Sequence, residues 1–231
     1  MDHVTQVVDL TQILGPGTIL WPDSHPFQAE TALRYEDGGA FARNVVTPEH
    51  AGTHLDAPAH FDPNGMTVAE IPVGHLVVPA VMIDVSAAAR DDSDLTVEAE
   101  TIAEHEDEHG EIEPGSAVLL RTGWDQFVGD PETYGGADIG DLQFPGFGTS
   151  AAELLVDRGV AGLGIDTLSV DPGHALEFPV HHITLPAGLW HLECLVSLDR
   201  LPPRGATLFV GPIPMAEGSG SPARVLAVLP V

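Results

Sequence analysis

The sequence contains no lysine and a single cysteine, Cys194. Its eight basic residues are therefore all arginines, and with 35 acidic residues they give a formal net charge of −27 at pH 7. A surface this acidic repels nucleic-acid phosphates and anionic membranes, so we expect neither as a partner. The lone cysteine excludes an intramolecular disulfide and is typical of proteins from a reducing compartment.

Long hydrophobic runs are also missing. No apolar segment approaches the roughly 20 residues that span a bilayer, and the first ten residues lack the basic start and apolar stretch of a secretory signal. We therefore expect a cytoplasmic protein. The acidity allows two interpretations: a cation-attracting face for a partner, or a solvated acidic coat suited to a salt-rich cytoplasm. The second is favoured, because salt shortens the repulsion between surface charges to a few ångströms.

What the chain does contain is a series of short apolar runs of β type, separated by turns rich in glycine and proline. Continuous apolar runs are the pattern of strands buried on both faces. Since no internal repeat or low-complexity linker interrupts the chain, residues 1–231 are interpreted as a single α/β domain in which strands predominate. The predicted strands are 4–10, 75–86, 116–123, 159–166, 206–212 and 223–229.

Three segments between these runs have helical patterns. The segment 95–110 has Thr96 as a cap, acids in its first turn and Gly110 as a stop. A second helix is predicted to begin at Ser150, which stands three residues before a glutamate, as in a capping box. A third segment, 188–198, predicts a short buried helix.

The segment "HAGTHLDAPAHF" combines three histidines and an aspartate with a glycine and a proline. In a fully extended chain the ten residues between its first and last histidines would span about 33 Å, too far to share one ion. The glycine and the proline permit bends that can bring these side chains together. Such a concentration of ionisable groups in a bent segment predicts a divalent-metal site. The four side chains are His50, His54, Asp56 and His60.

Two imidazoles and a carboxylate are the donor set expected for catalytic Zn²⁺, and Mn²⁺ tolerates it equally. Three protein ligands leave a coordination position for water, whose pKa a divalent ion lowers from about 15.7 toward 7. Further ligands are expected from the segment 178–195, although spacing alone does not choose among its candidates. These are His181, His182, His191 and Glu193.

The same twelve residues match the His-x-Gly-Thr-His-x-Asp-x-Pro-x-His signature of the metal-dependent cyclase-type hydrolases, a family that includes bacterial kynurenine formamidases and isatin hydrolases. The resemblance covers nearly the whole chain and implies a fold similar to the swivelling β/β/α domain, assembled as a homodimer. It extends through 8–27, 164–172, 178–182, 192–205 and 218–229.

For the metal ligands, the resemblance implies two divalent ions per chain, Zn²⁺ or Mn²⁺, bridged by one carboxylate. A twelve-residue gap selects which of two adjacent histidines pairs with Glu193. The glutamate favours this two-metal arrangement, because isatin hydrolases resemble a one-metal design with a polar ligand in its place. The implied ligands are His50, His54 and Asp56 for one ion, and Asp56, His181 and Glu193 for the other.

Two further roles follow from the resemblance. His60 stands at the position of the catalytic acid–base, and an imidazole with a pKa near 6.5 is suited to shuttle a proton; the alternative is that His60 is a third imidazole ligand. Trp21 stands where formamidases place an aromatic ring against the substrate, or it is a packing anchor in a proline-punctuated loop. Cys194 is interpreted as a small buried side chain, since nothing near it in the sequence suggests an activated thiolate.

The favoured function is therefore a small-molecule hydrolase of the arylformamidase type, which converts N-formylkynurenine to kynurenine and formate in tryptophan catabolism. The first alternative is an isatin hydrolase-like enzyme that opens a cyclic amide or lactone. The second is a metal-binding protein on the same scaffold without turnover.

Overall fold

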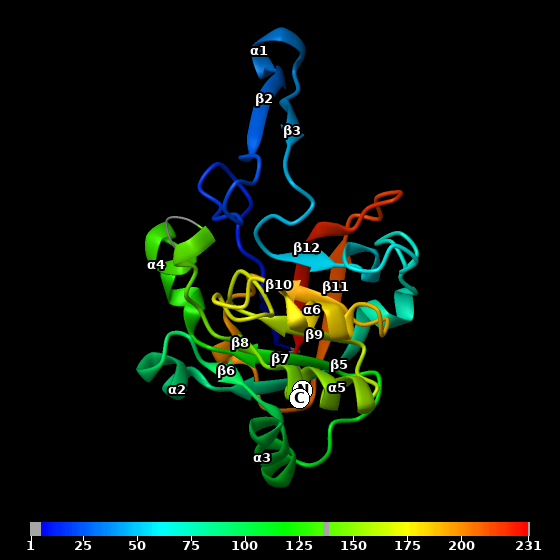
Figure 1. The fold of residues 1–231 in the computed structure, drawn as a ribbon. Coiled ribbons are helices and arrows are strands. Elements are labelled where there is room, and N and C mark those ends of the chain that lie inside the picture. The colour runs from blue at the N-terminus through cyan, green and yellow to red at the C-terminus, as the bar shows by residue number, and fades with distance from the viewer. Residues whose placement is uncertain (1–5, 136–138, 231) are drawn as a thin grey trace.

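The computed structural model describes residues 6–135 and 139–230. Its centre is a sheet of strands in the order β12-β11-β5-β7-β9-β10-β4 (Figure 1). The sheet closes into a barrel because its last strand, β4, also pairs with its first, β12. One further strand, β1, pairs with β12. Neighbours from β5 through β7 and β9 to β10 are parallel, and the other pairs are antiparallel. The strands are β1 (Val7–Asp9), β4 (His54–Asp56), β5 (Val77–Asp84), β7 (Ala117–Arg121), β9 (Gly162–Ile165), β10 (Trp190–Glu193), β11 (Ala206–Pro212) and β12 (Gly220–Val228).

Side chains of alternate residues along these strands fill two separate cores. Leu119 of β7 packs inside the barrel, whereas Val118 and Leu120 pack outward against the helices. The predicted strand runs are continuously apolar for this reason, since both faces are covered. The helices are α2 (Ser86–Asp91), α3 (Ala99–His109), α4 (Pro131–Gly135), α5 (Thr149–Asp157) and α6 (Pro179–Thr184), with 3₁₀ turns η1 (Pro58–His60), η2 (Val73–Leu76), η3 (Trp124–Phe127), η4 (Ile139–Asp141) and η5 (Leu198–Arg200).

The α/β, strand-rich fold class is confirmed. Each of the six predicted runs contains a strand, and the run 4–10 forms β1, although its residues 4 and 5 lie outside the described part. Among the described residues, no helix is both long and apolar enough to cross a membrane.

Two helix caps were predicted wrongly. Thr96 lies in β6 (Thr96–Val97), which pairs with β8 (Gly146–Phe147), and α3 is capped by Glu98 and ends at Gly110 as predicted. The cap of α5 is Gly148 rather than Ser150, because the Ser150 hydroxyl is already occupied: it donates to the Glu98 carboxylate and accepts from the backbone at the start of α3. A contact between two helix starts has replaced the local capping box.

The segment 188–198 is buried, but it is not the predicted helix. It forms β10 and reaches η5 after a loop. A short apolar run fits either structure, and here pairing with β9 on one edge and β4 on the other decides for a strand.

A two-stranded arm extends from the body of the molecule (Figure 1). It consists of β2 (Gln28–Leu33), the single turn α1 (Tyr35–Gly38) and β3 (Ala42–Val46), and its strands pair only with each other. Large apolar side chains on this arm are about half exposed or more, so the arm has a hydrophobic surface that the rest of the chain does not cover. They are Leu33, Tyr35, Phe41, Val45 and Val46.

Candidate metal centre

The register of two short strands places four ionisable side chains together. In the antiparallel pair β4–β10, His191 lies opposite Asp56 and Glu193 lies opposite His54. Residues two apart on a strand share a face, so the two cross-strand pairs are neighbours on the same side of the sheet. All four side chains are buried.

His181 joins this group from α6. Its Nε2 lies 3.5 Å from Asp56 Oδ2 and 3.6 Å from Glu193 Oε1. The helix is fixed by Asp171, whose carboxylate accepts hydrogen bonds from the backbone N–H of Val180 and from both the N–H and the ring Nδ1 of His181. His182, the alternative from sequence, is exposed and is not part of this group.

His50 and His60 approach from the other side. Gly52, with a φ of +59°, turns the chain between His50 and β4, and η1 returns it after β4, so that the two imidazole rings stack with centroids 4.0 Å apart. His50 Nδ1 lies 2.6 Å from Asp56 Oδ1. One donor atom each from His50, Asp56 and His60 lie within 4.8 Å of one another, so the geometry brings His60 within reach of a ligand role as well as an acid–base role.

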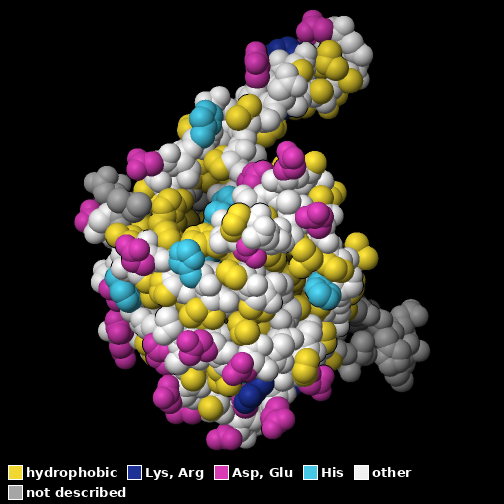
Figure 2. All heavy atoms as spheres, turned by 45° about the vertical axis from the view of Figure 1, so that its right-hand side comes forward, with side chains coloured by type: hydrophobic (Ala, Val, Ile, Leu, Met, Phe, Trp, Pro, Cys, Tyr) yellow, Lys and Arg dark blue, Asp and Glu magenta, His cyan; other side chains and the backbone are white. Residues whose placement is uncertain are grey.

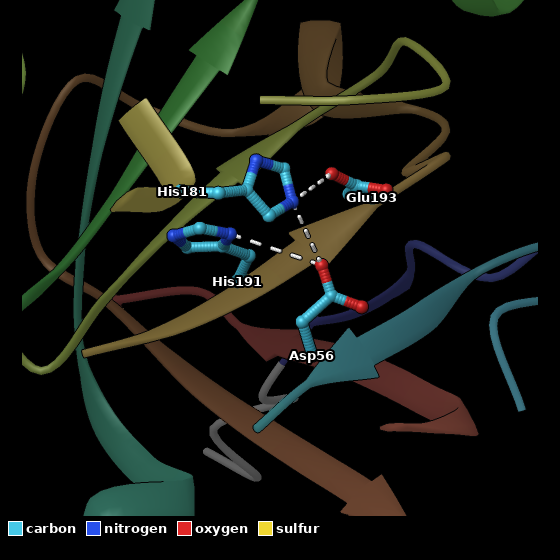
Figure 3. A group of neighbouring side chains, drawn as sticks. All are labelled: Asp56, His181, His191 and Glu193. Atoms are coloured by element: carbon cyan, nitrogen blue, oxygen red, sulfur yellow. Dashed lines mark ion pairs between the residues drawn. The ribbon is translucent and has the colours of Figure 1, made fainter. Parts of the chain in front are cut away.

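The two oxygens of the Asp56 carboxylate face different histidines. Oδ1 lies 2.6 Å from His50 Nδ1 and 3.2 Å from His54 Nε2, whereas Oδ2 faces His181 at 3.5 Å and His191 at 3.8 Å (Figure 3). A carboxylate placed in this way has the geometry of a bridging ligand between two positions.

Hydrogen-bond partners fix which ring nitrogen carries the proton in two of these imidazoles. His54 Nδ1 lies 2.8 Å from the Gly52 carbonyl oxygen, and His181 Nδ1 lies 2.6 Å from Asp171 Oδ2. Both partners only accept, so Nδ1 must donate in each ring. In the neutral form Nε2 of both histidines then presents a lone pair toward Asp56 and Glu193.

Buried polar atoms without hydrogen-bond partners mark the same place. Among the described residues they include His54 Nε2, Asp56 Oδ2 and His191 Nδ1. Such atoms cost free energy unless a partner satisfies them, and lone pairs directed at carboxylate oxygens repel each other unless a cation lies between. The residues present therefore fit a divalent metal.

The electrostatics agree with this assignment. Burial disfavours the charged forms, yet the hydrogen bond to Asp171 and the nearby carboxylates of Asp56 and Glu193 raise the pKa of His181 to about 10, and Asp56 raises the pKa of His54 well above its usual value. Despite its burial, the pKa of Asp56 is held well below its usual range by His50 and His54. The shifts have one cause: the buried carboxylates of this cluster favour positive charge on the histidines around them.

A cavity of about 300 Å³ opens onto this cluster. Its wall is aromatic, with the Trp21 and Phe178 ring centroids 5.4 Å apart and those of Phe61 and Phe178 5.7 Å apart. The cavity floor carries His50, His54, His60, His181 and Glu193.

Trp21 both lines the cavity and packs on a buried cluster beside Cys194. Cys194 is itself buried, and this burial raises the pKa of its thiol, in keeping with an unactivated side chain.

Sequence reasoning missed two residues that matter in this geometry, Asp171 and Thr184, and named His191 only as one of four open candidates, outside the ligand set that the resemblance implies. His191 and Glu193 repeat the two-residue spacing of His54 and Asp56, a signal that would have been visible had β10 been predicted as a strand. Asp171 gave no local signal, because its contact with the ring of His181 depends on how the intervening loop folds.

Comparisons with known proteins cover almost the whole chain. Residues 8–172 match the family described as "Putative cyclase". Isatin hydrolase from Roseibium aggregatum is 35% identical, with 97% of this chain and 92% of that protein covered, and kynurenine formamidase from Bacillus cereus is 30% identical, with 95% of each covered. The solved structure of isatin hydrolase A from Ralstonia solanacearum superposes with a TM-score of 0.92 at 36% identity, covering 98% of this chain and 92% of the other.

Proposed function

This chain belongs to the cyclase family of hydrolases, and from that membership we propose that it is a metal-dependent enzyme that cleaves the carbonyl–nitrogen bond of an aromatic amide. The observation that carries the proposal is the unpartnered His54 Nε2, directed at two carboxylates beside an aromatic cavity. Only a cation or a proton satisfies this arrangement.

Two cation positions are proposed, with Asp56 shared between them. His50 and His54 would hold one cation with Oδ1 of Asp56, and His181 and Glu193 would hold the other with Oδ2. A divalent cation bound there would polarise the substrate carbonyl and lower the pKa of a water molecule. Zn²⁺ and Mn²⁺ both suit the donor set.

His60 is proposed to move the protons. Desolvation by the surrounding cavity, with His50 and His181 nearby, lowers the pKa of His60 although part of its side chain stays exposed, so the ring is neutral at pH 7. A neutral imidazole at the cavity can accept a proton from the water that attacks the carbonyl. It can then deliver that proton to the nitrogen as the carbon–nitrogen bond breaks.

The cavity supports a cyclic aromatic amide such as isatin ahead of an open-chain aryl formamide, the reverse of the order favoured by sequence. Away from the metal cluster its described lining is mainly aromatic and aliphatic, with Ser24 and Ser169 as uncharged polar residues, and contains no arginine. N-formylkynurenine carries an amino-acid carboxylate and ammonium group, whose burial costs free energy without polar partners. Isatin is a neutral planar bicycle, and burial of its two carbonyl groups and one N–H costs less free energy than burial of two formal charges.

Parallel assays of the metal-loaded protein with isatin and N-formylkynurenine, followed by absorbance, test this order. We expect faster turnover of isatin, and loss of turnover in the His60→Ala variant. A clear preference for N-formylkynurenine would reverse the order. Bound metal with no reaction toward any aromatic amide would favour the non-catalytic alternative.

A second copy of this chain is proposed as the partner that covers the arm. An isolated two-stranded hairpin is marginally stable in water, and this one exposes apolar side chains. Residues 28–46 carry three acidic residues and two arginines, a net charge of −1 in a chain of net charge −27. Arg34 and Arg43 have no ion pair among the described residues, and both are exposed, so these two side chains are available to acidic groups on the body of a second copy, which Figure 2 shows to be numerous.

Light scattering after gel filtration tests this proposal. We expect twice the chain mass of 24.3 kDa for the wild-type protein and a shift toward the monomer in the double variant Phe41→Glu/Arg43→Glu. Val73→Glu is the matched control, because Val73 is 81% exposed and belongs to η2, not to the arm. A monomeric wild-type protein would contradict the proposed homodimer.

A further inference from the structure

We infer that His191 binds, through Nδ1, the cation held by Asp56, His181 and Glu193, an inference that rests on the proposed metal-dependent function. His191 is fully buried on β10, directly opposite Asp56. It lies outside the ligand set that the sequence motif implies.

The first step is the position of the proton on the His191 ring. Nε2 lies 2.7 Å from the hydroxyl oxygen of Thr184. Thr184 donates its single hydroxyl proton to the carbonyl oxygen of Val180, one helical turn back, so it can only accept from His191. Nε2 therefore carries the hydrogen, and Nδ1 of the neutral ring presents a lone pair.

The second step is what that lone pair faces. His191 Nδ1 points at Asp56 Oδ2, 3.8 Å away (Figure 3), and neither atom has a hydrogen-bond partner among the described residues. The distance is too long for a hydrogen bond, and both atoms are acceptors. A histidine retained only for packing would have both nitrogens satisfied, so the pair is explained by a cation between them.

The third step is the completeness of the set. One donor atom from each of Asp56, His181, His191 and Glu193 lie within 4.8 Å of one another, and all four residues are buried. Four protein donors fill a tetrahedral shell, as in metal sites without an open position. Each imidazole is held by an acceptor on its far nitrogen, Asp171 for His181 and Thr184 for His191, which fixes both rings toward the cation.

The two proposed cation positions therefore differ. In the set of Asp56, His181, His191 and Glu193, here called the rear position, Asp56 and His191 do not line the cavity, whereas His181 and Glu193 do. His50, His54 and His60 on the other side all line it. The rear position has a complete protein shell, and the front position, held by His50, His54 and Asp56, keeps an opening toward the cavity. A cation at the front position would be the one within reach of a substrate in the cavity, while a cation at the rear position would hold the strands and the shared carboxylate in place.

Metal content after dialysis of His191→Ala and Thr184→Val tests the inference. We expect His191→Ala to hold one equivalent fewer of Zn²⁺ than the wild-type protein. Thr184→Val keeps the ring and the side-chain volume but removes the acceptor, and we expect about 10- to 100-fold weaker binding of Zn²⁺ at the rear position. His75→Ala, a change at an exposed histidine, is the control and should retain wild-type metal content.

The outcomes separate this inference from the proposed function. Wild-type metal content in His191→Ala and wild-type affinity in Thr184→Val would overturn the role of His191 while leaving the hydrolase proposal intact. If His191→Ala does not fold, as judged by circular dichroism, the Zn²⁺ affinity of Thr184→Val decides. A wild-type protein that binds no divalent metal and hydrolyses no amide would contradict the proposed function itself.

Discussion

Asp56 contributes one carboxylate oxygen to the histidines on each side of the cluster, so its two oxygens have different neighbours. Both proposed cation positions depend on it. Its replacement is therefore expected to have a different effect from the replacement of a ligand that serves one position.

Asp56→Ala should lower the metal content at both positions, because each loses an anionic donor. Metal analysis after dialysis measures this directly, with Asp62→Ala as a control at a nearby acid outside the cluster. Full occupancy in Asp56→Ala would exclude the bridging role.

His60→Ala should leave the metal content near the wild-type value while the turnover number falls at least about 100-fold, the usual loss when a general acid–base is removed. Metal analysis and steady-state assays on one preparation distinguish the two proposed roles of His60. If metal is lost together with activity, His60 is a ligand, as its position within 4.8 Å of the His50 and Asp56 donor atoms also allows.

Residue-level prediction succeeded where the motif itself bends the chain. The structure places the side chains of His50, His54, Asp56 and His60 together, although their roles as ligands and acid–base stay predictions. The contact of Asp171 with the ring of His181 could not be predicted, because no periodicity relates a loop carboxylate to a histidine ten residues later.

Among the elements, β12 limits the space available to His50. A Cβ atom added at Gly220 would lie 2.5 Å from Cε1 of His50 and 2.9 Å from its Nδ1. Glycine is required here to let the imidazole lie against the backbone of the strand.

Gly220→Ala should weaken metal binding about 10- to 100-fold, because the added Cβ atom forces the His50 ring away from Asp56. The fold should be retained, because the His50 ring is the end of a half-buried side chain and can shift. Titration with Zn²⁺ or Mn²⁺ measures the affinity, and Gly74→Ala, with no atom within 4 Å of the added Cβ, is the control. Unchanged affinity in Gly220→Ala would argue against His50 as a ligand.

At the level of elements, the sequence predicted where a helix or strand occurs better than which of the two it is. The short apolar runs form strands as predicted, but the segment 188–198 forms β10 and not a helix, because the neighbouring strands β4 and β9 supply hydrogen bonds that the sequence pattern alone does not indicate. The arm was not predicted either, because its strands pair only with each other and its apolar side chains are exposed, so they do not belong to a buried core of this chain.

For the whole molecule, the acidic coat is the dominant electrostatic feature. Figure 2 shows acidic side chains spread over the body, with few basic ones on the same face. The net charge of −27 implies that repulsion among these groups opposes the folded state at low ionic strength.

Added salt should therefore stabilise the protein. Between 0.1 M and 1 M KCl the Debye length falls from about 10 Å to about 3 Å. We expect the melting temperature to rise by roughly 5 °C, which corresponds to about 2 kcal/mol for a chain of this size. Sucrose at equal osmolality is the control for solute exclusion, and a melting temperature indifferent to KCl would remove the salt-adapted interpretation of the surface.

Strand β4 pairs on both of its edges, with β10 and with β12, so its register is fixed. A one-residue slip of β4 would turn His54 and Asp56 away from their partners, and the strands on both sides prevent it. The aromatic residues above the cluster belong to no strand: Trp21 and Phe178 stand in loops, and Phe61 follows η1. Substitutions at Trp21 are therefore expected to reshape the cavity wall while the register of β4, and with it the positions of His54 and Asp56, is kept. Phe61 and Phe178 allow less change, because both rings contact His181.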